Sequence, residues 1–455
     1  ADSQPSAGDL MQRGRAAARE GSYEEAPLAW KAAAELYDQA GETKNHIQAL
    51  TQSAFAARTL GHINQAFLQE ELALHLARQL RDSQWLVITL SELGKTYVTN
   101  HQYEVAADYI GQALEIAQAQ SFRALSPALQ NDLGIVLALQ GRPEEALAAF
   151  HQCAVSAKQE GLIPLFIRAR VNAARMAIQV AQFDTATSAL AEAADQLAGS
   201  ASSYEKAEGL VNLALGYRDL ALAHSGSHAS ALKRSAIFLQ EAAGMTQHPG
   251  DARLASYVYG HLGHLYEVER RFDEALQLTR QAVFTAQSAR APESLYRWQW
   301  QSGRLLNRLG QLDDALSAYQ EAAITLHPIR SEVTFAVQTS PDSHQPSIRA
   351  LYFELADLLL RRAALMHENR EAEAYLRAAR DVIEAFKAAE LRDYFRDDCV
   401  DQMQARITKL DALSPSTAII YPIVFSDRTE LLVSLPDGLT RHSVPVTAAT
   451  LTDEV

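Results

Sequence analysis

Small residues recur at a fixed spacing along the chain, inside stretches whose apolar residues repeat every three to four positions. The first small residue of each period is Gly14, Ala54, Gly94, Gly134, Ala174, Ala214, Gly263 or Gly303. The spacing is 40 residues except for one interval of 49, which follows Ala214. Two helices approach closely only where side chains are small, so each period predicts an α-helical hairpin with the small residue at the helix contact.

The turn and the second helix of each hairpin have their own signals. A second small residue follows the first by twelve positions in seven periods, at Ala26, Ala66, Ala106, Ala146, Ala186, Ala275 and Ala315. Glycines suited to a left-handed helix end stand between the two, at Gly21, Gly61, Gly141 and Gly310. Pro127, Pro143, Pro164 and Pro292 lie near predicted helix starts, where proline is tolerated. After Ala214 about nine residues are extra, which predicts a longer loop between the two helices around Gly226.

Two segments carry a known repeat pattern. Leu93-Gly94-Lys95-Thr96-Tyr97, followed by Tyr103 and Ala106, resembles the tetratricopeptide repeat, and Leu262 to Tyr266 with Phe272 and Ala275 repeats the pattern. The resemblance covers about residues 8–326. It implies a right-handed all-α solenoid of about eight hairpins over residues 1–326, with the first helix of each hairpin on the concave face. The usual period of the family is 34 residues, so these helices are expected to be longer.

The pattern changes after the repeats. Residues 327–347 form a loop-rich break, and Leu351 to Leu365 and Glu371 to Leu413 predict a capping helix pair, so that 327–413 closes the solenoid. From 414 to 455 the period becomes that of strands, at Ile419 to Val424, Glu430 to Leu435 and Leu439 to Val446. Three short apolar strands form a β-meander that needs a helix layer or more sheet.

Three stretches of this last part resemble a second family. Glu354 to Leu360 and Lys387 to Phe395 are similar to the segment that joins tetratricopeptide repeats to the CHAT domain, a caspase-related domain of bacteria. The Ile-Tyr-Pro, Asp-Arg and Leu-Pro-Asp-Gly elements between Ile420 and Gly438 resemble the opening of that domain. The resemblance implies an incomplete α/β CHAT domain, truncated just after its start, whose catalytic His and Cys lie downstream. It also implies a bacterial protein, cytoplasmic by default; the opening Ala-Asp-Ser leaves an exported mature form open.

Composition and single residues narrow the chemistry. The net charge of −14 argues against nucleic acid as a partner, and no apolar run is long enough to span a membrane. Cys153 replaces a packing alanine and is predicted to be buried, while acidic neighbours of Cys399 raise the pKa of its thiol. His261, His264 and Glu267 share one helix, and we interpret them as repeat positions rather than metal ligands. We therefore expect no cofactor, no metal and no catalysis within these residues.

The predicted concave face reverses the charge balance of the chain. Its positions on the first helices carry ten basic residues, namely Arg15, Arg19, Arg58, Lys95, Arg168, Arg175, Arg218, Arg297, Arg304 and Arg308, against the acidic Glu208, Asp219 and Glu267. Four of the cations (Arg19, Arg58, Arg218 and Arg308) lie late in their helices, where the helix dipole favours them without any ligand. In long-helix relatives an Asn near the Leu-Gly pair binds the backbone of a peptide. Asn131, Asn172 and Asn212 lie at or beside that position in this sequence.

These observations predict a peptide-binding face that suits an acidic ligand. The candidate residues are Arg168, Asn172, Arg175, Asn212, Arg218, Tyr257, Arg297, Trp300, Arg304, Asn307 and Arg308. The first hypothesis is a protein- or peptide-binding scaffold that regulates, or presents substrate to, an attached CHAT cysteine protease, so that its partners are a protein or peptide and its own CHAT domain. The alternative is a structural, self-associating scaffold with an inactive CHAT portion.

Overall fold

The computed structural model describes residues 5–19, 25–201, 203–330, 333, 347–395, 418–435 and 438–453. They fall into two compact units. The first unit is drawn from Ala1–Leu265, Phe284–Arg290 and Ile329–Gln345, and the second from Tyr266–Val283, Ala291–Pro328 and Pro346–Val455. Predictions on Gly21, Cys399 and residues 396–413 lie outside the described residues.

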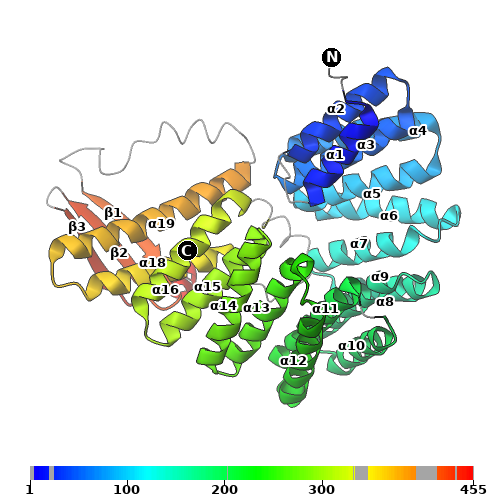
Figure 1. The fold of residues 1–455 in the computed structure, drawn as a ribbon. Coiled ribbons are helices and arrows are strands. Elements are labelled where there is room, and N and C mark those ends of the chain that lie inside the picture. Colours follow the sequence, from blue (N-terminus) through cyan, green and yellow to red (C-terminus); the bar gives the residue numbers. More distant parts are fainter. Residues whose placement is uncertain are drawn as a thin grey trace. The chain divides into compact units, whose positions relative to one another are not determined.

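Helices account for most of both units and alternate as the small residues predict (Figure 1). The first helices of the eight predicted hairpins are α1 (Ala7–Arg19), α3 (Thr43–Thr59), α5 (Ser83–Thr99), α7 (Ser126–Leu139), α9 (Ile163–Gln179), α11 (Tyr204–Ala223), α13 (Ala252–Val268) and α15 (Pro292–Arg308). The second helices are α2 (Glu25–Gln39), α4 (Ile63–Leu80), α6 (Tyr103–Ala119), α8 (Pro143–Gln159), α10 (Phe183–Ala198), α12 (His228–Met245), α14 (Phe272–Ser288) and α16 (Leu312–Leu326). Every first small residue lies in a first helix, so the all-α repeat fold is confirmed.

The turns within hairpins use a left-handed residue. Gly61, Gly141 and Gly310 have φ of 82°, 73° and 80°, as their sequence position predicts. Where the glycine is absent, His101 and Ala181 occupy the same turn position at φ 58° and 57°. The turn geometry is therefore set by the helix pair, and a side chain is accepted there at a cost in backbone energy.

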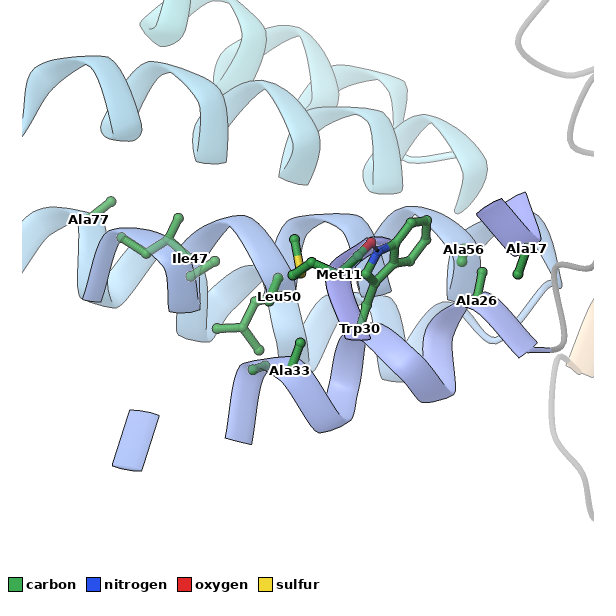
Figure 2. Packing of buried hydrophobic residues seen from close by; sticks show 12 residues of the cluster. Met11, Ala17, Ala26, Trp30, Ala33, Ile47, Leu50, Ala56 and Ala77 are labelled. Atoms are coloured by element: carbon green, nitrogen blue, oxygen red, sulfur yellow. Dashed lines mark hydrogen bonds between the residues drawn. The ribbon is translucent and has the colours of Figure 1, made fainter. Parts of the chain in front are cut away.

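Bulky residues of the second helix pack onto the small residues of the first. A Cβ added to Gly134 would meet the Phe150 ring at 2.7 Å, and one added to Gly14 would meet the Trp30 indole at 2.4 Å. Trp30 also donates from Nε1 to the Met11 carbonyl oxygen at 3.3 Å, inside the apolar cluster drawn in Figure 2. The close approach of the helices requires the small residue.

Each second helix has a buried residue sixteen positions after the small residue of the first helix, or twenty-five in the long period. The eight residues are Trp30, Glu70, Ile110, Phe150, Leu190, Leu239, Thr279 and Tyr319, and all are at most 3% exposed. Glu70 is the one charged residue in this set, and its side chain is fully buried.

The irregular period does not have the longer loop that the sequence predicts. Helix α11 ends nine residues after Ala214, whereas α5 ends five residues after Gly94. Helix α12 begins seven residues before the buried Ser235, whereas α6 begins three before Ala106, and the linker 224–227 is only one residue longer than usual. Each helix thus gains about one turn, which returns its side chains to the same face. Ser235 takes the alanine position and donates to the Ala214 carbonyl oxygen at 2.7 Å.

Two more helices and a small sheet complete the second unit. Helices α18 (Ile348–Ala364) and α19 (Asn369–Phe395) form the predicted pair. Strands β1 (Ile419–Val424), β2 (Thr429–Leu435) and β3 (Gly438–Val444) form an antiparallel meander in the order β1-β2-β3, followed by the short helix α21 (Ala448–Asp453). The sheet finds its helix layer beside α18 and α19, and Phe353 of α18 meets Phe425 with ring centroids 6.0 Å apart (Figure 1).

Charged groups also join the sheet to α18. Glu430 of β2 is fully buried and receives Arg428 Nε and Arg441 Nη2, each at 2.6 Å. Arg428 also pairs with Asp357, and Arg441 donates to the Leu360 carbonyl oxygen at 2.8 Å. One buried carboxylate thus holds two arginines that both reach α18.

Candidate functional site

Successive first helices of the first unit lie close enough to form one continuous surface. Helices α3, α5, α7, α9 and α11 contact one another in order, while contacts between neighbouring second helices are sparser among the described residues. The residues two before and one after each small residue lie three apart and therefore share a helix face. We call this surface the inner face; it consists of Gln52, Phe55, Glu92, Lys95, Asp132, Ile135, Asn172, Arg175, Asn212 and Leu215.

The inner face alternates along one row. The residues after the small position are Phe55, Lys95, Ile135, Arg175 and Leu215, apolar and basic in turn. Phe55 is 39% exposed although it lies on a first helix. Each residue two before the small position is polar, so apolar contacts and hydrogen-bonding groups stand side by side.

Lys95 joins two first helices, α5 and α7, through one ammonium group. Its Nζ lies 2.9 Å from Glu92 Oε1 on its own helix and 3.2 Å from Asp132 Oδ2 on α7. The three side chains are 35%, 22% and 19% exposed for Lys95, Glu92 and Asp132. Burial alone would raise the pKa of Glu92, but Lys95 and Arg58 outweigh burial and lower it to about 2.

Behind this cluster lies a buried cation. Arg58 on α3 is 2% exposed; its Nη1 lies 3.1 Å from Glu70 Oε1 and its Nη2 lies 3.0 Å from Glu92 Oε2. Arg58 also donates to the Thr96 hydroxyl at 2.9 Å. Burial raises the pKa of Glu70 to about 8, although Arg58 and Thr96 act in the opposite direction.

The predicted residues on α9 and α11 are largely engaged within the protein. Asn172 is buried and donates from Nδ2 to Asn131 Oδ1 at 3.4 Å. Arg175 Nε and Arg218 Nε donate to the buried carboxylate of Asp219 at 3.1 and 3.0 Å. The remaining two candidates on these helices differ: Arg168 is exposed and Asn212 is half-buried.

The candidates on α13 and α15 are also mostly occupied. Trp300 is 3% exposed and its indole donates to Glu354 of α18 at 2.7 Å, so it does not offer a surface to a peptide, contrary to the prediction. Arg304 forms a bidentate pair with Glu267, with distances of 3.1 and 3.0 Å. Asn307 accepts a hydrogen bond from Arg361 at 3.4 Å.

Three further candidates complete the comparison. Tyr257 stacks on His261 with ring centroids 6.2 Å apart. Arg297 is half-buried over the Tyr296 ring, and Arg308 is exposed.

At three of the predicted basic positions a carboxylate of the protein itself balances the positive charge. Lys95, Arg175 and Arg304 each meet a carboxylate from another first helix. Counting charges in the sequence missed these pairs, and it also missed Phe55, Ile135 and Asp132. The spacing of 40 residues could have identified these three, because Phe55 and Ile135 hold the repeat position of Lys95 and Asp132 holds that of Glu92.

Other candidate chemistry is structural in the described residues. Cys153 is fully buried as predicted, and burial followed by the charge of Asp132 raises the pKa of its thiol to about 12. No cluster of His, Cys, Asp and Glu that could hold a metal ion occurs in the part of the chain that the structure describes. Within the same residues no helix is long and apolar enough to cross a membrane.

The comparisons with known proteins agree with the hairpin geometry. The model of the tetratricopeptide repeat family matches residues 85–159, from α5 to α8. This match and the helix pairs support a tetratricopeptide-type repeat protein. Among curated proteins none matches the chain significantly.

Several solved structures resemble the chain at low identity. The human IFIT1 dimer with m7Gppp-AAAA has 12% identity and a TM-score of 0.48, covering 89% of this chain and 91% of that one. The apo form of the quorum sensor NprR from B. thuringiensis has 12% identity and a TM-score of 0.43, with 82% and 97% covered. A thermophilic tetratricopeptide repeat protein from Thermus thermophilus has 19% identity and a TM-score of 0.32, with 47% and 98% covered.

Proposed function

We propose that this chain is a scaffold that binds an extended segment of another protein along the inner face of its first unit. The observation that supports the proposal is the accessibility of that face. Nine of its ten residues, all except Asn172, are at least partly exposed, although they belong to helices whose opposite side forms the core. Apolar residues gathered in one row and bordered by polar side chains suit a protein-binding surface.

A random-peptide display library selected against the whole chain tests this proposal. Binders are then measured on Phe55→Asp and Leu215→Asp, which place a charge in the row, and on the matched control Leu68→Asp. Leu68 is 70% exposed on α4, a second helix, so the control adds the same charge away from the inner face. We expect at least one inner-face variant to weaken each binder about tenfold. Binders that both inner-face variants leave unchanged would contradict the proposal.

A finer proposal concerns the attached protease. We propose that the scaffold regulates, or presents substrate to, a CHAT-type cysteine protease whose catalytic groups lie outside this sequence. The resemblance of the strand segment supports it, as does the Arg428–Glu430–Arg441 cluster, which ties those strands to α18. A displacement of α18 would therefore also move the strands that carry Glu430 and Arg441.

Thiol-dependent peptide hydrolysis by the natural protein, abolished by an alkylating reagent, is the result expected of this finer proposal. Its absence, together with oligomers that grow with concentration in light scattering, would favour the self-associating scaffold with an inactive CHAT portion. Either outcome leaves the peptide-binding proposal to be judged by the display experiment.

A further inference from the structure

The inner face between α3 and α7 has an unequal distribution of charge. Five charged side chains form one network of ion pairs in which the sign alternates, in the order Glu70, Arg58, Glu92, Lys95 and Asp132. The network has a carboxylate at each end. One end, Glu70, is fully buried, and the other, Asp132, is 19% exposed on the inner face.

The two carboxylates that share Lys95 are not equally compensated. Glu92 is bonded by both Lys95 and Arg58, at 2.9 and 3.0 Å. For Asp132, the described residues provide one cation, Lys95, at 3.2 Å. Of the two carboxylates that share Lys95, Asp132 is therefore the one that a further cation would stabilise more.

Apolar residues lie on both sides of the cluster. Ile135 stands one turn after Asp132 on α7, and Phe55 holds the same repeat position two repeats earlier, on α3. Neighbouring packed helices have axes about 8–10 Å apart, so these two side chains are about 20 Å apart. An extended chain advances about 3.3 Å per residue, so about six residues span that distance.

We propose that the inner face from α3 to α7 recognises an extended peptide with two apolar residues six positions apart and a basic residue two positions before the second. Side chains of an extended chain alternate between faces, so positions 1, 5 and 7 point the same way. Position 1 contacts Phe55, the basic residue at position 5 pairs with Asp132, and position 7 contacts Ile135. This inference rests on the proposed function and specifies its ligand.

The charge preference is the opposite of the acidic ligand that counting arginines predicts. It follows from the charged side chains that the inner face carries from α3 to α7, where Glu92 and Asp132 stand against Lys95 alone because Arg58 is buried behind the cluster. A pair formed at a partly exposed site is weakened by salt. Binding of the basic peptide should therefore decrease as ionic strength rises.

Labelled synthetic peptides of the pattern Leu-Ser-Gly-Ser-Lys-Ser-Leu, flanked by Gly-Ser, provide the probe, with fluorescence anisotropy as the measurement. We expect the lysine peptide to bind the unmodified chain about tenfold more tightly than the same peptide with glutamate. We also expect either Leu→Ser change, or a shift of the first leucine by one position, to weaken binding about fivefold or more. These comparisons need no change to the protein.

Protein variants then locate the contacts. Asp132→Asn should reduce the preference for lysine over glutamate to about twofold, whereas Asp108→Asn, on the exposed side of α6, should leave it unchanged. Phe55→Ser should remove the preference for the first leucine, and the control Leu68→Ser should not. Circular dichroism confirms that each variant is folded.

Three results would overturn the inference. Equal affinity for the lysine and glutamate peptides would refute the role of Asp132. Display binders that map to the inner face but lack the spacing and the basic residue would refute the pattern while the proposed function stands. A library that yields no inner-face binder would refute the proposed function as well.

Discussion

The guanidinium of Arg58 lies 3.1 Å from the carboxylate of Glu70, and both side chains are buried. Glu70 occupies the helix-contact position that holds Ile110, Phe150 and Leu190 in other repeats. An ion pair therefore replaces an apolar contact between α3 and α4, and Arg58 extends it to Glu92 on α5.

Removing one partner of this pair should be costly. Arg58→Met leaves Glu70 buried without its cation. We expect a loss of about 3–5 kcal/mol in the free energy of unfolding in urea at pH 9, where the Glu70 carboxyl is ionised. The double variant Arg58→Met with Glu70→Leu should recover most of the loss, because it restores the apolar contact of the other repeats. Arg142→Met, which removes an exposed pair with Glu145, is the control and should change stability by less than about 1 kcal/mol. A double variant no more stable than the single one would contradict this account.

Glu70 should also make stability depend on pH. Its pKa of about 8 in the folded chain lies above its ordinary value of 4.5, so folding binds a proton between these values. The contribution is full below pH 4.5 and is lost as pH rises through 8. The thermal melting temperature should therefore decrease as pH rises from about 4.5 to about 8 and level off above that, and Glu70→Gln should flatten this part of the profile.

Glu92 should make stability fall as the pH is lowered, which is the opposite of the effect of Glu70. Its pKa of about 2 lies below the ordinary 4.5, so its contribution is present above pH 4.5 and is lost as pH falls toward 2. Glu92→Gln should therefore destabilise the chain at pH 6 and have little effect at pH 2. A Gln variant that is equally destabilising at both values would show that the carboxylate charge is not the cause.

The glycines at helix crossings should respond differently from other helical glycines. Gly134→Ala places a Cβ 2.7 Å from Phe150 and should destabilise the chain by about 1–3 kcal/mol. Gly111→Ala, in α6 with nothing within 4 Å of the added Cβ, should stabilise it by up to about 1 kcal/mol. Urea unfolding of both variants provides the comparison, and equal effects would contradict the packing argument.

Cys153 should be unreactive in the folded chain. Its thiol is fully buried and its pKa is raised to about 12, so little thiolate forms at pH 8. In a Cys399→Ser background, a thiol reagent should modify Cys153 only after denaturant is added. Rapid labelling of the native variant would show that the helix contact around residue 153 opens readily.

The sequence by itself determined the repeats. Small residues at a period of 40, glycines at turns such as Gly61 and Gly141, and prolines at helix starts are local signals of helix geometry, and all reappear at the predicted positions. The change to a two-residue period likewise predicted the three strands. The burial of Cys153 followed from its repeat position.

Only the tertiary structure decided which charges meet. Arg58 and Glu92 are 34 residues apart and Arg175 and Asp219 are 44, so their pairing depends on how successive hairpins pack. Trp300 is covered by Glu354, 54 residues later, for the same reason. In the period after Ala214 the spacing showed how many residues are extra. Only the structure shows that they lengthen α11 and α12 by about one turn each. Helix periods are fixed by neighbours in the chain, whereas the charge of a surface is fixed by neighbours in space.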